Sequence, residues 1–429
     1  MQSNSTPANP LASSFLGPLQ KAEHLASHLS RRCGAIADSD FLLSGIHRVL
    51  DATDSGRDHL QKMAASLPVT VKRSSYFESL KSKRRLAHTQ EISRNITNVM
   101  GEVIPDLLAK ALPLLDEYEV FAGDGHWHSH ATHDKATSST GGKYAMGHLY
   151  GLNLRTQGLF HLTAADQKAR NKEHDMRGLK RQTIKDLRQG TATGRKVIWL
   201  WDPAGIDLRQ WYRWKQAGGI YFISPVKKNM LIEEGNAPMP YDQTDPLNDG
   251  VLGDYLWAGN SCGVPMRLVH YRDPITGKEF HFVTSLTNSD IAPGVIAHLY
   301  RMRWDIEKVF DDVKNKLHET KAWASSETAK SNQANLICIS HNLIRLFEKQ
   351  MEIDHGLVNE GEKRRKSKRM AREKSKQEKK GEHLPVLFEL LQRTTQASVK
   401  FIRWIRYSVF GQTCESTAIA SLRCCYANL

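Results

Sequence analysis

The stretch from Asp290 to Lys316 constrains the fold most strongly, because its apolar residues recur with the period of a helix. At about 100° per residue they share one face, and its members are Val295, Leu299, Met302, Ile306, Val309, Phe310, Val313 and Leu317. Asn288, Ser289 and Asp290 are possible N-caps, and Pro293 suits the first turn of a helix. The pattern predicts one long helix whose apolar face packs into a core.

Polar residues follow one edge of the same face. Tyr300, Arg303, Glu307 and Lys314 would lie within about 60° of one another on a helix. One carboxylate therefore shares a stripe with an aromatic hydroxyl and two cations. An ordinary amphipathic helix with charges at the boundary of its apolar face is the alternative interpretation. The stripe favours a metal ion at Glu307 and a polyanion along the length of the helix.

The spacing Tyr-x2-Arg-x3-Glu-x6-Lys resembles the Y-R-E-K signature of bacterial insertion-sequence transposases of the DDE class. Four fixed residues at fixed spacing arise by chance at roughly one position in 10^5 at ordinary residue frequencies. The resemblance implies that Glu307 is the third catalytic carboxylate. It also implies that Tyr300, Arg303 and Lys314 grip the transposon end, and that two catalytic aspartates lie upstream in a ribonuclease-H-like fold.

The pattern of strands and helices upstream predicts such an α/β domain separately from the signature. A short strand candidate, Glu117–Gly123, ends at Asp124. The continuous apolar run Lys196–Trp201 is typical of a buried central strand, and Asp202 stands at its end. The other expected elements are the hairpin strands His148–Asn153 and Gly158–Thr163, the helices Met176–Arg188 and Asp207–Ala217, and the strand Gly219–Val226. This is the element order of a ribonuclease-H-like domain.

The residues Asp124, Asp202 and Glu307 fall at the three places where that fold carries its acids. Mg²⁺ or Mn²⁺ ions prefer carboxylate oxygens, and two such ions can activate a nucleophile and stabilise the leaving oxygen of a phosphodiester. We assign Asp124 as the ligand bridging both ions, with Asp202 completing one site and Glu307 the other. Each is one acid among 46, so the assignment depends on the set. The family commonly has an aromatic residue where Ile206 stands here.

The segment 228–288 separates the last strand from the predicted helix and is expected to be a β-rich insertion. Met266–Tyr271 and Glu279–Val283 alternate around a turn at 273–277. The resembling transposases have an insertion here that contacts DNA, where an aromatic residue stacks on a flipped base. Trp257 is the candidate for that role, and a core tryptophan is the alternative.

A cluster of histidines directly follows Asp124, and its members are His126, His128, His130 and His133. Closely spaced histidines can bind zinc, but no cysteine accompanies them and a flexible loop would not fix a tetrahedral arrangement. For His126, a DNA contact or a proton donor is one interpretation, and a histidine with no role is the other.

Composition suggests how the chain divides around the catalytic domain. Residues 16–112 have helical periodicity and a basic stretch, which fits a DNA-binding domain or a helical cap with a solvated basic face. A run rich in Lys and Arg is typical of a solvated linker or frayed helix and would add salt-sensitive phosphate binding. The predicted regions are a disordered tail (1–15), the helical domain (16–112), the catalytic domain (113–352), the basic linker (353–382) and a helical C-terminal segment (383–429).

The formal net charge of +14 favours a nucleic-acid partner. No apolar run reaches transmembrane length, and no secretory signal or CxxC pair is present. Together with the resemblance, these features predict a cytoplasmic, nucleoid-associated DDE transposase with no membrane partner and no small-molecule cofactor. We expect a homodimer that acts on transposon-end and target DNA with two Mg²⁺ or Mn²⁺ ions. The alternatives are a DNA-binding descendant that no longer cuts and a metal-dependent structure-specific nuclease.

Overall fold

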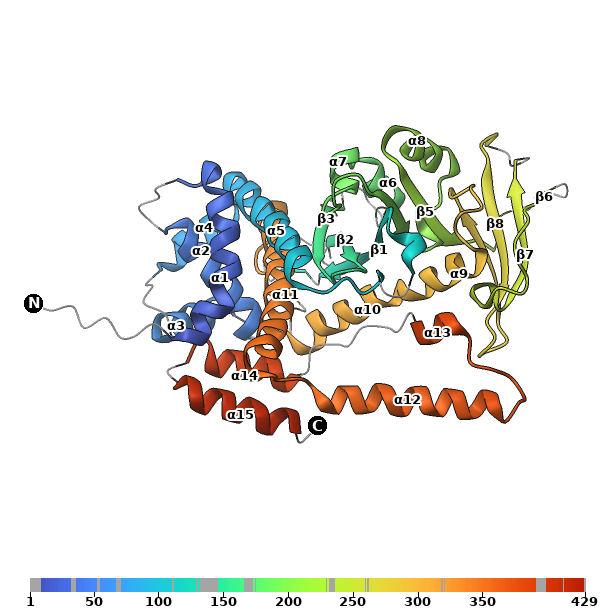
Figure 1. Cartoon of the computed structure of the whole chain (residues 1–429). Coiled ribbons are helices and arrows are strands. Elements are labelled where there is room, and N and C mark those ends of the chain that lie inside the picture. The colour runs from blue at the N-terminus through green and yellow to red at the C-terminus, as the bar shows by residue number, and fades with distance from the viewer. Residues whose placement is uncertain are drawn as a thin grey trace, which may run out of the picture.

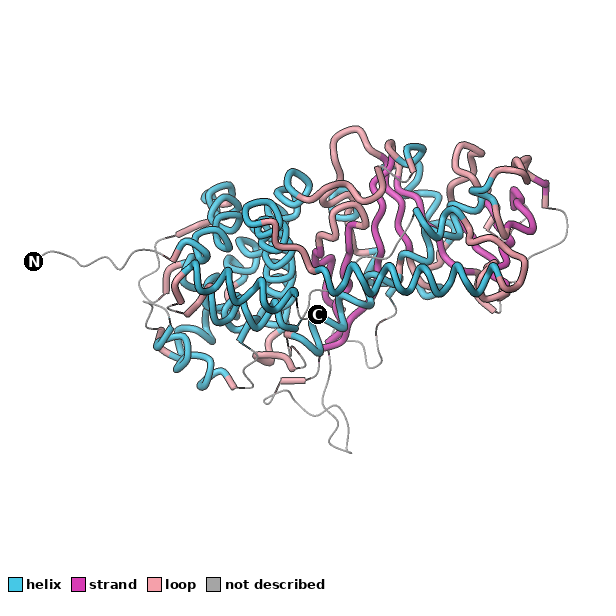
Figure 2. Tube along the Cα trace, turned by 60° about the horizontal axis from the view of Figure 1, so that its bottom comes forward, coloured by secondary structure: helices cyan, strands magenta, loops and turns pink. Residues whose placement is uncertain are grey.

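The computed structural model places helices around one end of the molecule and a long mixed sheet at the other (Figures 1 and 2). The described residues are 9–31, 36–51, 55–66, 71–109, 112–128, 130–131, 146–165, 173, 175–228, 230, 236–258, 260, 262–317, 319, 321–390, 399–411 and 413–427.

The first part of the chain is helical. Its helices are α1 (Pro10–Leu25), α2 (Asp38–Asp51), α3 (Gly56–Ser66), α4 (Arg73–Leu80) and α5 (Lys83–Val103). The Asn9 side chain caps α1 by accepting from the Leu11 N–H at 3.1 Å, and its amide donates to the Ser408 carbonyl at 2.7 Å. The helix therefore begins inside the segment 1–15 that was expected to be a tail, and residues 1–8 lie outside the described part.

The sheet contains nine strands in the order β3-β2-β1-β4-β5-β9-β8-β7-β6 among the described residues. β1 pairs antiparallel with β2 and parallel with β4, and β4 pairs parallel with β5. The strands are β1 (Tyr118–His128), β2 (Met146–Asn153), β3 (Leu159–Ala164), β4 (Lys196–Leu200), β5 (Ile220–Pro225), β6 (Ala237–Pro238), β7 (Val251–Trp257), β8 (Met266–Arg272) and β9 (Glu279–Thr284). The hairpin predicted around residues 148–163 is confirmed as β2 and β3.

The strands from 237 to 284 extend the sheet of the preceding part instead of forming a sheet of their own. Their link is β9, which pairs antiparallel with β5 at Ile223, Ser224 and Pro225. The β8–β9 hairpin forms at the predicted turn, where the Gly277 N–H donates to the Asp273 carbonyl at 2.7 Å. The segment 228–288 is thus joined to the central strands by backbone hydrogen bonds.

Helices cover both faces of the central strands. One face packs against α6 (Asp175–Lys180), α7 (Ile184–Leu187) and α8 (Leu208–Gly218), so the single helix expected over 176–188 is two short helices. The other face packs against α9 (Pro293–Met302) and α10 (Trp304–Asp311). Alternation along β1 explains this sandwich, because Phe121 belongs to the first core and Val120 and Ala122 to the second.

The helix α11 (Glu327–His355) joins the helical end to the sheet. Its residues Leu336, Ile337 and Leu343 share a core with α1, α2 and α5, whereas Ala334 and Cys338 belong to the core under the sheet. The chain then forms α12 (Glu360–Glu378), α13 (Val386–Leu390), α14 (Val399–Ser408) and α15 (Glu415–Ala427). α14 and α15 pack into the core of the N-terminal helices. The segment expected to be a basic linker, 353–382, is therefore largely helical.

A buried amide side chain on α11 forms hydrogen bonds with the backbone of the edge strand β3, and another bonds to α4. The Leu159 N–H donates to Asn342 Oδ1 at 2.8 Å, and Asn342 Nδ2 donates to the Leu159 carbonyl at 2.9 Å. Asn332 Nδ2 donates to the Leu80 carbonyl of α4 at 2.9 Å. Asn342 and Asn332 are fully buried. These amides satisfy backbone groups that a bare edge and a helix end would leave unpaired.

We expect Asn342→Ala to lower the free energy of unfolding by about 2–4 kcal/mol, because both polar backbone groups of Leu159 would stay buried without partners. Urea denaturation of purified variants measures this. Asn98→Ala is the matched control, since Asn98 is exposed on α5 and its loss should change stability little. Equal stability of the two variants would show that the Asn342 amide does not support the sheet edge.

Candidate active site

Parallel pairing of β1 and β4 places two of the predicted acids side by side. Ala122 and Leu200 are register partners. Asp124 and Asp202 each follow two residues later, so both side chains point to the same face of the sheet. The Asp124 carboxylate accepts the Gly125 N–H at 2.8 Å, and the Asp202 carboxylate accepts the Ala204 N–H at 3.0 Å. Each carboxylate is thus oriented by a backbone donor of its own segment.

A tryptophan ring packs closely against the segments that carry these two acids. Trp201 is fully buried on the opposite face, between Gly123 and Gly205. A methyl group at Gly123 would lie 1.7 Å from the ring, and one at Gly205 would lie 2.0 Å from it. Both positions therefore require glycine. This packing could not be predicted from the sequence, because it depends on which side of each strand the Trp201 ring occupies.

The predicted helix over 290–316 is interrupted. α9 ends at Met302. In the turn that follows, hydrogen bonds span three residues instead of four, from the Arg303 N–H to the Tyr300 carbonyl and from the Ile306 N–H to the Arg303 carbonyl. α10 then leads into a π-helical turn, η5 (Asp312–Lys316). The predicted apolar face is confirmed, because all eight of its residues are buried. The suggested N-caps were wrong, since Ala292 is the N-cap and its own side chain forms no capping hydrogen bond.

The start of α9 is held from outside by the strands of the insertion. Arg267 and Asp254 form a fully buried ion pair on β8 and β7, at 2.7 and 2.8 Å. Arg267 Nη1 also donates to the carbonyls of Asn288 at 2.8 Å and Ile291 at 2.9 Å. The Gly294 N–H in the first turn of α9 donates to Asn248 Oδ1 at 3.2 Å. Residues of the insertion therefore hold both the segment that enters the helix and its first turn.

Arg303 joins the helix to the first acid. Its Nη1 lies 3.2 Å from Asp124 Oδ2, and its Nη2 lies 2.7 Å from Glu307 Oε1. The Arg303 side chain is only 9% exposed, whereas those of Asp124 and Glu307 are 21% and 32% exposed. The Tyr300 ring lies 5.7 Å from the guanidinium. The structure therefore brings together Tyr300, Arg303, Glu307 and Asp124, residues that the sequence analysis had named separately.

The pKa of Asp124 is influenced by the other two acids. Burial raises the pKa of Asp124 to about 6, and Asp202 and Glu307 add to the rise, while Arg303 and the Gly125 N–H oppose it. Burial alone would lower the pKa of Arg303, but Tyr300, Asp124 and Glu307 outweigh it and raise the pKa. The guanidinium thus stays charged and compensates carboxylates that would otherwise repel one another.

The histidine cluster begins on a strand and not in a loop. β1 continues to His128, and His126 is the register partner of His148 on β2. The His126 ring stacks on Phe310 of α10 with centroids 4.8 Å apart. Burial lowers the pKa of His126 to about 4, and Lys314 contributes to the decrease. Lys314 itself is exposed. His133 lies outside the described residues.

Two tryptophans differ in their access to a ligand. Trp257, the predicted base-stacking residue, is 3% exposed and packs in a core, so its ring is covered in this conformation. Trp304, which the sequence analysis did not select, is 49% exposed and directly follows Arg303. Its exposure could not be read from periodicity, because the turn at Arg303 changes the angle at which α10 presents its first residue.

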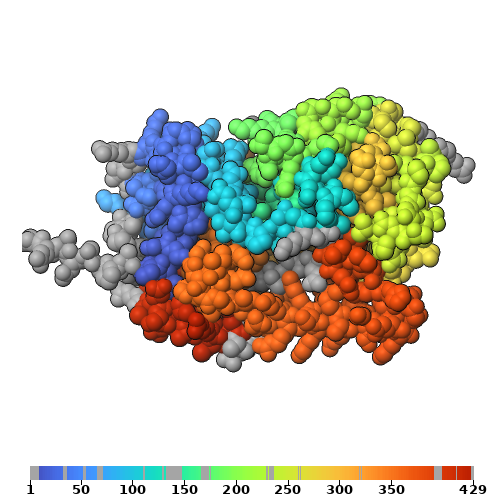
Figure 3. Space-filling view, in the orientation of Figure 1, coloured from blue at the N-terminus to red at the C-terminus, as the bar shows by residue number. Residues whose placement is uncertain are grey.

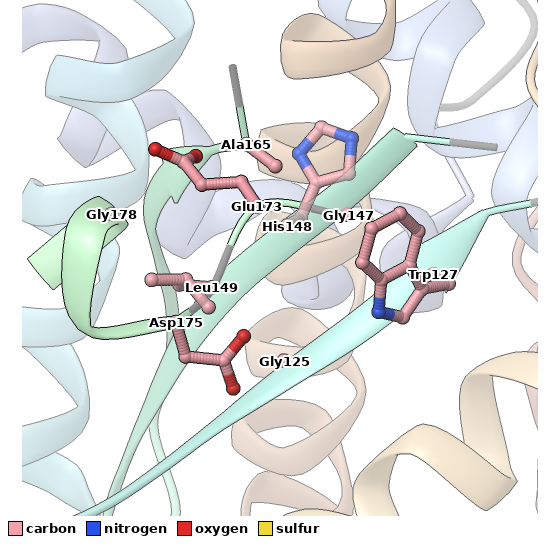
Figure 4. A pocket seen from close by; sticks show the side chains of 9 residues that line it. All are labelled: Gly125, Trp127, Gly147, His148, Leu149, Ala165, Glu173, Asp175 and Gly178. Carbon is pink, nitrogen blue, oxygen red and sulfur yellow. The ribbon is translucent and has the colours of Figure 1, made fainter. Parts of the chain in front are cut away.

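A small cavity lies on the other side of β1 (Figure 4). It has a volume of about 10 Å³, enough for one water molecule, beside Gly125 and Gly147. The carboxylates of Glu173 and Asp175 and the Trp127 ring line it. Because Gly125 and Asp124 face opposite sides of the strand, these acids are separated from the three-carboxylate group by the sheet.

Within the described parts of the chain, no three His, Cys, Asp or Glu side chains are arranged closely enough to hold a metal ion. At the three-carboxylate group, Arg303 occupies oxygens of Asp124 and Glu307. In chemical type, the carboxylates suit a hard divalent cation.

Comparison with known proteins identifies the family. The family model described as "Transposase DDE domain" matches residues 116–343, more than half of the chain. The chain belongs to the DDE transposase family. The match begins just before β1 and ends within α11, so it contains Asp124, Asp202 and Glu307. A search of curated proteins found no match.

Membership in the DDE transposase family makes this chain a DNA-processing protein of a family that generally uses divalent metal ions. DNA is accordingly its class of substrate. Among the described residues, no helix combines the length and apolar character needed to cross a membrane.

We expect Gly123→Ala to destabilise this transposase by about 1–3 kcal/mol, because the added methyl group would displace the Trp201 ring. Thermal unfolding measures the change. Gly101→Ala is the control, since its methyl group would meet no atom within 4 Å and would favour the helix α5. A Gly123→Ala protein as stable as the control would show that the strand ends adjust freely.

Replacing the buried pair tests how the insertion positions α9. Arg267→Ala alone should cost about 3–5 kcal/mol, because Asp254 would remain buried and uncompensated. Arg267→Met with Asp254→Leu should fold, yet it removes the donor to the carbonyls before α9. We expect this double variant to bind DNA normally and to nick it up to about 100-fold more slowly in single-turnover assays.

The matched control for this double variant is Arg272→Met with Glu279→Leu, which removes an exposed ion pair of the same hairpin. It should nick at the wild-type rate. A normal rate in the Arg267/Asp254 variant would show that the buried pair supports the fold alone.

Proposed function

We propose that this protein is an insertion-sequence transposase that cuts at the ends of its element and joins them to target DNA. The observation that supports this most directly is the pairing of Arg303 with Asp124 and Glu307, while Asp202 follows the strand β4 beside β1. The Tyr300, Arg303, Glu307 and Lys314 spacing adds the Y-R-E-K signature to the family match.

The catalytic domain is proposed to be ribonuclease-H-like. The order β3-β2-β1-β4-β5 supports this, with β2 antiparallel to both β1 and β3, β4 parallel to β1, and β5 parallel to β4. One acid lies on the first strand, one after the fourth and one on a late helix, which is the expectation drawn from the sequence. The proposed catalytic domain spans 113–352, and 228–288 is its β-rich insertion.

We assign Asp124 as the ligand shared by two Mg²⁺ or Mn²⁺ ions, with Asp202 and Glu307 completing one site each. Such ions, when bound, supply an activated water or 3′-hydroxyl and stabilise the leaving oxygen. Gly125 and Ala204 orient the aspartates through backbone donors. The exposed sides of Asp124 and Glu307 give access from solvent.

Arg303 has two roles in this scheme. In the protein alone it neutralises Asp124 and Glu307. With the carboxylates compensated by bound cations, the Arg303 guanidinium would be able to bind a phosphate of the transposon end, as its place in the signature implies. Tyr300 and Lys314 extend the same contact, and the exposed Trp304 ring is placed to stack on an unpaired base.

Other parts of the expectation are kept as proposals. Helices in 16–112 are the proposed DNA-binding domain, and the active assembly is a homodimer on the two element ends in the cytoplasm, associated with the nucleoid. The basic composition supports DNA as the partner.

The decisive experiment compares wild type with Asp124→Asn, Asp202→Asn and Glu307→Gln on a duplex carrying the terminal repeat, in Mg²⁺ or Mn²⁺. Wild type should nick at the repeat boundary and join the 3′-hydroxyl end to a second duplex. Each variant should bind DNA but lose at least about 10³-fold in nicking rate, because one ligand no longer carries charge.

Arg209→Gln, an exposed change on α8, is the control and should act as wild type. Unchanged nicking in one acid variant would remove that residue from the site. Nicking without joining would favour the structure-specific nuclease, and binding without nicking by wild type would favour the non-cutting descendant.

A further inference from the structure

The helix α12 is the most strongly basic element of the structure. It carries nine Lys and Arg residues against four Glu residues between 360 and 378. Three of the cations pair with glutamates of the same helix, at Lys363–Glu360, Arg365–Glu362 and Lys376–Glu373. The helix has almost no apolar face, so burial of apolar surface does not explain its position. Figure 3 shows it along the lower edge of the molecule, with one long side uncovered.

A polar contact holds α12 near its C-terminal end. Gln377 is 1% exposed and its Nε2 donates to the Pro274 carbonyl, in the turn between β8 and β9, at 3.0 Å. Toward the N-terminal end, Lys366 is partly buried. The helix is therefore attached to the insertion by a buried amide.

Helical geometry separates an inner from an outer face. The partly or fully buried positions are Gly361, Glu362, Lys366, Met370, Glu373 and Gln377, and from Glu362 onward they recur every three or four residues. Opposite them, Arg364, Lys368 and Arg372 follow one another every fourth residue and are exposed. At 1.5 Å per residue, successive members of this row rise about 6 Å along the helix. The outer face thus presents a ladder of cations.

We propose that the outer face of α12 binds the sugar–phosphate backbone of DNA without regard to sequence. The inference deepens the proposed function, on which it depends for DNA as the substrate. Duplex DNA carries one negative charge about every 1.7 Å of its axis, so each member of a straight row of cations about 6 Å apart would have phosphates within reach. Because the helix is already formed and is held at Gln377, binding costs little ordering of the backbone.

The charge distribution favours DNA over a second copy of the chain. The chain has 60 Lys and Arg against 46 Asp and Glu, so another copy would approach this face with a net charge of the same sign. The exposed cations are long and separated, which suits phosphates spaced along a strand. Contact between α12 and a second copy is therefore an outcome that the test must separate from DNA binding.

The test uses the full-length triple variant Arg364→Gln, Lys368→Gln, Arg372→Gln. Its matched control is Lys185→Gln, Arg209→Gln, Arg213→Gln, which removes three exposed cations from α7 and α8. Fluorescence anisotropy gives Kd for a terminal-repeat duplex and a random duplex of equal length at several salt concentrations. Circular dichroism and light scattering follow helicity and oligomeric state.

We expect the α12 variant to bind both duplexes more weakly by the same factor, at least about tenfold at low salt, and to lose about 2.7 from the slope of log K against log salt. The control triple should match wild type. A charge-retaining variant, Arg364→Lys, Lys368→Arg, Arg372→Lys, should keep the wild-type slope, which separates loss of charge from loss of structure.

An unchanged affinity and slope would overturn the proposal. Weaker binding of the repeat duplex alone would also overturn it, because α12 would then read sequence, and so would a changed oligomeric state with normal DNA binding. Nicking by wild type is assayed separately. A protein that binds through α12 but does not nick contradicts only the proposed function, whereas nicking with an unchanged salt slope contradicts only the role of α12.

Discussion

The ion pairs of Arg303 with Asp124 and Glu307 connect segments 179 residues apart and set the geometry of the site. Carboxylates brought together at the end of a sheet repel one another and lose hydration, so they need a compensating charge in the protein alone. Arg303 supplies it from the turn between α9 and α10. The position of that turn depends in part on the Arg267–Asp254 pair before α9, and so on the strands of the insertion.

Polar side chains join separate parts of this protein, in addition to the apolar cores that these parts share. Asn342 and Asn332 attach α11 to β3 and α4, Arg267 attaches β8 to α9, and Gln377 attaches α12 to the β8–β9 turn. Each bonds backbone groups that lie between two elements. Such contacts are directional, so they fix orientation where apolar packing alone would allow sliding.

The sequence predicted the parts of the site that depend on local pattern. The strands that carry or precede Asp124 and Asp202 and the helical face of Glu307 follow from alternation and periodicity. In the structure Arg303 pairs with both Asp124 and Glu307, but Asp124 lies within β1 and not at its end. The interrupted helix could not be predicted, because a turn at Arg303 whose hydrogen bonds span three residues instead of four keeps nearly the same spacing of apolar residues.

Other differences arise from contacts that no local pattern records. β1 continues through His128 because β2 offers it a partner, and strand formation depends strongly on such context. Likewise, the basic segment 353–382 has the composition of a solvated linker, yet it forms a helix held at Pro274 by a residue 103 positions away. The roles of the acids depend on ions and DNA and remain proposals.

The core at the helical end has a consequence for how the protein is made. It contains Leu11 and Phe15 from α1 together with Leu422 and Tyr426 from α15, and Asn9 donates to the carbonyl of Ser408. During synthesis, the first helices therefore lack part of their packing surface until almost all of the described chain has left the ribosome. The sheet can assemble earlier, since its strands lie between residues 118 and 284. The core of the helical end is thus completed late in synthesis, and a prematurely terminated chain would keep apolar surface exposed to proteases.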